Sequence, residues 1–265
     1  MNLAVVGLGL VGGSVGAALK AAGHSVTGYD ADATVRARAL EAGLVDRVVE
    51  APEAVGDRAE VVFLAVPVGA MLAVAREVAP GLEPGAVVTD TGSTKARLVA
   101  ELPAALPEGV AYVPGHPIAG SDRSGPDAAR ADLFAGKVTV LCAEGPLAER
   151  VAGLWRDAGS RVIFLPAGDH DTALARTSHL PHLVSYALAN FVECAEPDLA
   201  GDGLRDMLRL AGSDPVMWRD VFVHNRDAVL DALGGFEDAV AEARRLVEAG
   251  DPEAILAWLE AARRA

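Results

Sequence analysis

Residues 2–30 read NLAVVGLGLVGGSVGAALKAAGHSVTGYD, and this stretch decides the fold. The pattern predicts a strand, a glycine turn, a helix and a second strand, over residues 3–6, 7–12, 13–22 and 26–29. Three spaced glycines in the turn are typical of a backbone that turns tightly, comes close to a pyrophosphate and packs a helix on a strand. The first N–H groups of that helix have no partner within it and would face the phosphates. The stretch therefore predicts a βαβ unit that binds a dinucleotide.

The acid after the second predicted strand selects the cofactor. Asp30 stands at the distance from the turn, about 20 residues, at which a carboxylate holds the adenosine ribose. A carboxylate here repels a 2′-phosphate, and no Arg or Lys follows at positions 31 to 35. We therefore expect NAD rather than NADP. The expected cofactor-binding residues are Gly7, Leu8, Gly9, Leu10, Val11, Gly12 and Asp30, with Val66 and Pro67 from the loop after a later strand.

The remaining pattern divides the chain in two. Residues 60–66 form a continuous β-rich apolar run, which is typical of a strand buried on both faces of a parallel sheet. Strands and helices alternate to residue 165, and only helical patterns follow, the first a long helix over 167–193 bent at Pro181. We predict an α/β Rossmann domain with a doubly wound, mostly parallel sheet over residues 1–165. An all-α substrate and dimerisation domain is expected over residues 166–265.

The composition excludes several classes of function. The formal net charge of −14 argues against a nucleic-acid partner, whose phosphates require Lys and Arg. No apolar run approaches the roughly 18 residues of a membrane span, and no secretory signal precedes the first strand. Cys142 and Cys194 match no metal or redox spacing. We expect a cytoplasmic protein that acts on a small molecule, with no nucleic-acid or membrane partner.

One stretch concentrates groups that could carry chemistry. Residues 115–125 read GHPIAGSDRSG, and the glycines and proline predict a loop, neither helix nor regular strand. An enzyme that oxidises an alcohol with a nicotinamide needs a base for the hydroxyl proton, and His116 is the best candidate among the six histidines. His170 has no supporting pattern. Ser93 follows a strand at 86–89, where it caps the next helix, faces the cofactor, or does both.

Two further groups leave alternatives open. His179 and His182 lie three residues apart on one helical face, but no further ligand cluster is present, so we expect no metal site. Arg205 and Arg209 also share a helical face, where they form either a solvated, ion-paired surface or a guanidinium site for a carboxylate. Trp218 is expected in the core or an interface.

The motifs resemble those of the prephenate dehydrogenases of the TyrA family along almost the whole chain. They are the glycine turn with Asp30, DTGS at 90–93, GHPIAG at 115–120, SHLPH at 178–182 and SDPVMWRD at 213–220. The resemblance implies NAD-dependent oxidative decarboxylation of prephenate to 4-hydroxyphenylpyruvate in tyrosine biosynthesis, by a homodimer.

The resemblance also implies roles for individual residues. His116 would accept the proton of the ring hydroxyl, while Ser93 hydrogen-bonds the same oxygen and orients His116. Arg209 would bind a substrate carboxylate. Residues implied to assist or border the substrate are His182, Ser178, the segment at Gly203, and Trp218, which would approach the active site of the partner subunit.

Alternatives remain at this stage. Asp122 follows the GHPIAG motif, where an acid could meet the ammonium of arogenate and also tolerate prephenate, so arogenate (cyclohexadienyl) dehydrogenase activity is open. Other two-domain dehydrogenases, such as the β-hydroxyacid dehydrogenases and pyrroline-carboxylate reductases, rely on a catalytic Lys or a different loop, and residues 166–265 contain no lysine. A non-catalytic, NAD-sensing binding protein would leave His116, Ser93 and Arg209 unexplained.

Overall fold

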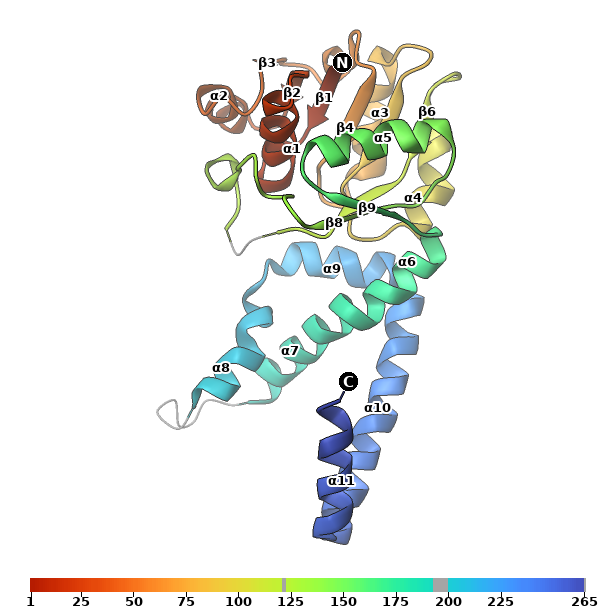
Figure 1. Cartoon of the computed structure of the whole chain (residues 1–265). Helices are drawn as coiled ribbons and strands as arrows, with labels where there is room; N and C mark the ends of the chain where they lie inside the picture. The colour runs from red at the N-terminus through yellow and green to blue at the C-terminus, as the bar shows by residue number, and fades with distance from the viewer. Residues whose placement is uncertain (121–122, 193–199, 265) are drawn as a thin grey trace. The chain divides into compact units, whose positions relative to one another are not determined.

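The computed structural model describes residues 1–120, 123–192 and 200–264 (Figure 1). Contacts among them divide the chain into two compact units. The first comprises Met1–Ala173 and Gly212–Asn225, and the second comprises Leu174–Ala211 and Arg226–Ala265. The domain boundary at residue 165 stays a prediction.

The first unit is built on a six-stranded parallel sheet with the order β3-β2-β1-β4-β5-β6. Its strands are β1 (Asn2–Val6), β2 (Ser25–Tyr29), β3 (Arg47–Val48), β4 (Val61–Leu64), β5 (Val87–Asp90) and β6 (Ala111–Val113). Strand order reverses between β1 and β4, and such a reversal opens a crevice at the carboxyl ends of the strands. This sheet confirms the predicted Rossmann-type fold.

Helices cover both faces of this sheet. They are α1 (Leu10–Ala21), α2 (Ala33–Glu41), α3 (Met71–Val78), α4 (Ala96–Glu101) and α5 (Pro146–Asp157). Because alternate side chains of a strand point to opposite faces, β1 serves two separate cores. Leu3 and Val5 belong to the core that contains Trp155 of α5, whereas Val6 belongs to the core that contains Met71 of α3.

A second, three-stranded sheet corrects two predictions. Its strands are β7 (Gly115–Pro117), β8 (Val138–Leu141) and β9 (Arg161–Phe164), with β7 antiparallel and β9 parallel to β8. The prediction of a loop over 115–125 is therefore wrong for its first three residues, because pairing with β8 holds His116 opposite Val140. Strands β8 and β9 also belong to this sheet, so the strands that alternate with helices up to residue 165 do not all join one doubly wound sheet.

The carboxyl-terminal part is helical, as predicted. Its elements are α6 (Ala167–Leu174), a π-helical turn (Ala175–His179), α7 (Leu180–Phe191), α8 (Asp202–Leu208), a 3-10 turn (Arg209–Gly212), α9 (Pro215–His224), α10 (Arg226–Ala249) and α11 (Pro252–Ala262). The sequence predicts one long helix that bends at Pro181. In the structure the departure from α-helical geometry is the π-helical turn before that residue. Pro181 has no N–H to donate to the carbonyl groups of the preceding turn, and that turn is π-helical instead of α-helical. Among the residues described, no helix is both long and apolar enough to cross a bilayer.

Candidate active site

The glycine turn fits a pyrophosphate. Gly7 has φ of +89°, and a Cβ there would collide with the carbonyl oxygen of Ala65. A Cβ at Gly12 would collide with the carbonyl oxygen of Gly7, so both positions require glycine. By contrast, a Cβ at Gly9 would meet nothing within 4 Å, and Gly9 begins α1 without a side-chain cap. The first N–H groups of α1 are thus left to a ligand that approaches the backbone.

Asp30 is tied to this turn. Leu8 N–H donates to Asp30 Oδ2 at 2.8 Å, and Asp32 N–H donates to Asp30 Oδ1 at 3.0 Å. Arg36, in the first turn of α2, donates from Nη1 to the carbonyl oxygen of Asp30 at 2.6 Å. Val66, from the loop after β4, lies 2.9 Å from the Cβ position of Gly7. The turn, the acid and the β4 loop therefore meet at the carboxyl ends of the strands.

A chain of three polar side chains runs behind His116. His116 is 8% exposed, and its Nδ1 lies 2.8 Å from Nε2 of His170, which is fully buried. Nδ1 of His170 lies 2.7 Å from Oδ1 of Asp171. Because an ionised carboxylate only accepts hydrogen bonds, His170 donates to Asp171, and a His170 with no second proton accepts from Nδ1–H of His116. In this tautomer Nε2 of His116 carries the lone pair that can take a proton.

Asp171 stays ionised in this arrangement. Burial alone would raise the pKa of its carboxyl, but hydrogen bonds from the His170 side chain and from the backbone N–H groups of Ala96 and Lys95 bring the pKa below its ordinary value. The two backbone bonds, both 2.8 Å long, place Asp171 at the N-terminus of α4. The alternative that Ser93 caps this helix is therefore wrong, because α4 begins at Ala96 and Asp171 takes its first N–H groups.

Asp90, at the end of β5, links the segments that carry Ser93 and His116. Gly92 N–H donates to its Oδ1 at 2.7 Å, and Gly115 N–H donates to its Oδ2 at 3.2 Å. The loop before α4 and strand β7 are thus held by one buried carboxylate.

The charge of Asp90 is fully compensated. Lys95 Nζ forms an ion pair with Oδ1, and both side chains are completely buried. Tyr112 donates its hydroxyl to Oδ2 at 2.6 Å, and burial together with the nearby Asp90 charge raises the pKa of Tyr112 well above its ordinary value. These partners lock the carboxylate in place.

The second unit carries a separate group of predicted residues. His182 donates from Nδ1 to the carbonyl oxygen of Ser178 at 2.9 Å. Burial lowers the pKa of His182, the Arg209 charge lowers it further, and the Ser178 carbonyl opposes both. The imidazole is therefore kept neutral, and in this tautomer its Nε2 can only accept a hydrogen bond.

The two arginines of α8 and its continuation differ in surroundings. Both are exposed, but Arg205 is paired with Asp202 at 3.2 Å. Arg209 lines a cavity of about 340 Å³ in the second unit. The cavity is bordered mostly by apolar side chains, among them Leu180, Pro181, Val184, Met207, Leu210 and Phe236. Of the two alternatives predicted for these arginines, Arg205 fits the solvated, ion-paired surface. Arg209 fits the guanidinium site for a carboxylate.

Two family models match this chain. The nucleotide-binding domain of prephenate dehydrogenase matches residues 15–164, and the dimerization domain of prephenate dehydrogenase matches residues 166–261. The chain belongs to the prephenate dehydrogenase family.

Individual members of this family are similar over nearly the whole chain. A cyclohexadienyl dehydrogenase of Zymomonas mobilis is 33% identical, over 100% of this chain and 94% of that protein. The crystal structure of prephenate dehydrogenase from A. aeolicus in complex with hydroxyphenyl propionate and NAD+ superimposes with a TM-score of 0.92 at 30% identity, covering 99% of this chain and 96% of that one. Synechocystis arogenate dehydrogenase gives a TM-score of 0.86 at 26% identity, over 99% and 98% of the two chains.

The sequence pattern alone did not identify His170 and Asp171 as functional residues. Their only local signal is an imidazole next to a carboxylate at the start of a helix.

Trp218 is 6% exposed in α9 of the first unit, where its ring lies 5.5 Å from that of Phe222. Gly203 is an exposed residue of α8. The predicted substrate residue Asp122, like Cys194, lies outside the described residues.

Proposed function

We propose that this protein is an NAD-dependent prephenate dehydrogenase that converts prephenate to 4-hydroxyphenylpyruvate and carbon dioxide in tyrosine biosynthesis. The observation that carries the proposal is the buried chain from Asp171 through His170 to His116, in a member of the prephenate dehydrogenase family. Such a chain suits a base that must take a hydroxyl proton during hydride transfer.

The cofactor is NAD, which supplies a hydride acceptor when bound. The residues assigned to hold it are Gly7, Leu8, Gly9, Leu10, Val11, Gly12, Asp30, Val66 and Pro67. The open backbone at Gly9 supports pyrophosphate binding, and the carboxylate of Asp30 favours an unphosphorylated ribose. The NAD+ named in the A. aeolicus complex supports the same assignment.

His116 acts as the general base. Its Nε2 takes the proton of the ring hydroxyl while hydride leaves the carbon that bears the oxygen. The bond to the ring carboxylate then breaks, carbon dioxide departs, and the electron pair of that bond enters the ring, which becomes aromatic as the oxygen regains a proton. Asp171 and His170 favour the protonated His116 because the carboxylate charge acts through the shared hydrogen bonds. Ser93 is proposed to bond the same ring oxygen.

Arg209 is proposed to bind a substrate carboxylate through its guanidinium. His182, kept neutral, would accept a hydrogen bond from the substrate. Ser178, Gly203, Trp218 and Asp122 complete the proposed substrate-binding residues. The second candidate function is arogenate dehydrogenase, which the names of the Zymomonas and Synechocystis relatives favour.

A homodimer is proposed to form through the helical second unit. Its helices α10 and α11 expose several large apolar side chains: Val240, Val247, Leu256, Trp258 and Leu259. The match of residues 166–261 to a dimerization domain supports the same arrangement. We place the boundary between the nucleotide-binding and the helical domain near residue 165 and the enzyme in the cytoplasm.

The decisive test follows reduced nicotinamide by absorbance with purified protein, NAD or NADP, and either prephenate or arogenate. We expect reduction of NAD with prephenate, with release of one carbon dioxide for each 4-hydroxyphenylpyruvate formed. A faster reaction with arogenate would select the second candidate function. Tight NAD binding without reduction on either substrate would contradict both.

A further inference from the structure

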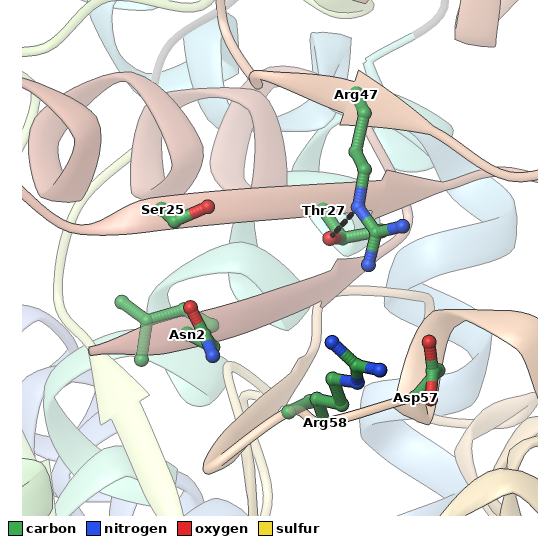
Figure 2. A pocket seen from close by; sticks show the side chains of 8 residues that line it. Asn2, Ser25, Thr27, Arg47, Asp57 and Arg58 are labelled. Carbon is green, nitrogen blue, oxygen red and sulfur yellow. Dashed lines mark hydrogen bonds between the residues drawn. The ribbon is translucent and has the colours of Figure 1, made fainter.

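A polar cavity of about 260 Å³ lies where the first two strands begin (Figure 2). It is lined by Asn2, Leu3, Ser25, Thr27, Arg47, Asp57, Arg58 and Ala59. The glycine turn begins at Gly7, after the other end of β1. The cavity is therefore at the opposite edge of the sheet from the predicted cofactor crevice.

Two guanidinium groups face this cavity. Figure 2 shows Arg47, on β3, and Arg58, in the turn before β4, directed toward one another. Arg47 Nε donates to Thr27 Oγ1 at 2.8 Å, which orients its guanidinium and leaves the two terminal nitrogens to other acceptors. Thr27 is itself 6% exposed, so the support for Arg47 is buried.

The charges at this cavity are not balanced. In the described part of the chain, neither Arg47 nor Arg58 forms an ion pair, whereas other exposed arginines, such as Arg38 and Arg244, pair with carboxylates. Asp57 is the one carboxylate among the lining residues, against two guanidinium groups. Guanidinium groups aimed at one another repel unless an anion lies between them. The chain as a whole has 37 acidic and 23 basic residues, so the positive charge at this cavity is opposite in sign to the net charge of the protein.

The backbone at Arg58 supports the same interpretation. Its φ is 55°, the one positive value among the non-glycine residues that the structure describes. This left-handed conformation is unfavourable for a residue with a Cβ, and it often persists where it aims a side chain at a ligand.

We propose that this cavity binds a tetrahedral oxyanion, either inorganic phosphate or the phosphate group of a small ester, between Arg47 and Arg58. The planar guanidinium presents paired N–H donors that match phosphate oxygens. Asn2 and Ser25, at the starts of β1 and β2, add polar donors at the rim. This proposal is independent of the proposed dehydrogenase activity, because its test measures the binding of phosphate and not the rate of a reaction.

The test uses the 265-residue protein with saturating NAD, so that phosphate cannot enter the glycine turn. Inorganic phosphate is titrated by calorimetry, with sodium chloride at equal ionic strength as the blank, and methyl phosphate replaces it in a second series. We expect saturable binding of inorganic phosphate, weakened by about tenfold or more in Arg58→Gln, as when a charge-assisted hydrogen bond is lost. Binding of methyl phosphate as well would identify an ester as the natural source, and its exclusion would identify free phosphate.

Arg76→Gln is the matched control, because Arg76 is an exposed arginine of α3 that lies outside the cavity lining. It should bind phosphate like the unaltered protein. Arg47→Gln provides a second variant should Arg58→Gln melt at the titration temperature. Equal phosphate binding in the unaltered protein and in both cavity variants would overturn the proposal, as would no binding beyond the chloride blank.

Discussion

His170 Nε2 lies 2.8 Å from Nδ1 of His116, so a second imidazole supports the candidate base at that nitrogen. Asp171 is one step further away, bonded to the other ring nitrogen of His170. The relay sets the tautomer of His116, while the intervening ring keeps the negative charge at a distance. Asp171 also holds the N-terminus of α4, so the same carboxylate orients the base and anchors the segment that follows Ser93.

Replacing the base itself should abolish most activity without affecting cofactor binding. In His116→Asn the hydroxyl proton has no acceptor, so we expect kcat to fall by roughly 10²–10⁴. The reduced-nicotinamide assay measures kcat, and titration of protein fluorescence with NAD measures cofactor affinity, which should stay unchanged. A wild-type rate in this variant would exclude His116 as the base.

Weakening the relay should change the pH profile as well as the rate. In Asp171→Asn the carboxylate charge is lost, so protonated His116 is less stabilised and the acidic limb of the kcat/KM profile should move to lower pH. Asp169→Asn is the matched control, because Asp169 is exposed on the same helix. A lower rate with an unshifted pH profile would indicate that Asp171 acts only on the fold.

The first sheet could be predicted because its signals are local. The glycines at 7 and 12 are required by collisions within their own βαβ unit and the adjoining β4 loop, and buried strands such as β4 are continuous apolar runs. Each of these features can be recognised in the sequence without knowledge of the tertiary contacts between helices and strands.

The relay could not be predicted from sequence because it depends on tertiary pairing. His116 and His170 are 54 residues apart, and their contact requires β7 to pair with β8 and α6 to pack against the N-terminus of α4. Gly115 and Pro117 flank His116 and suggest a loop, because neither residue favours a strand by itself. Hydrogen bonds with β8, and the bond that Gly115 N–H donates to Asp90, overcome that local preference.

Asp171 should also make stability depend on pH. Its pKa is below the ordinary value of 3.8 in the folded state, so its stabilising effect is present above that value and is lost as pH falls through the lower folded pKa. We therefore expect Asp171→Asn to unfold at lower urea concentration than the wild type at neutral pH, with the difference shrinking below about pH 4. A difference that persists unchanged into acid would contradict this, and Asp169→Asn should show none.

Arg209 and Arg205 provide a matched pair for substrate binding. In Arg209→Gln a carboxylate partner is lost, so KM for prephenate should rise by about tenfold or more while kcat changes less. Arg205→Gln removes an equal charge from an exposed ion pair and should leave both constants near wild type. Steady-state kinetics on both variants provides the comparison, and an equal rise of KM in the two would assign the effect to net charge.

Asp30 and Arg36 together predict how cofactor preference can be altered. The carboxylate of Asp30 repels a 2′-phosphate, whereas Arg36 is already held beside it by a 2.6 Å bond to the Asp30 carbonyl. In Asp30→Ser the carboxylate repulsion is removed while the guanidinium of Arg36 stays bonded to the backbone carbonyl of residue 30, so kcat/KM with NADP relative to NAD should increase by about tenfold or more. Asp32→Ser is the control, because Asp32 caps α2 through the N–H of Thr34 and its loss should leave the ratio unchanged. An unaltered ratio in Asp30→Ser would mean that another residue selects the cofactor.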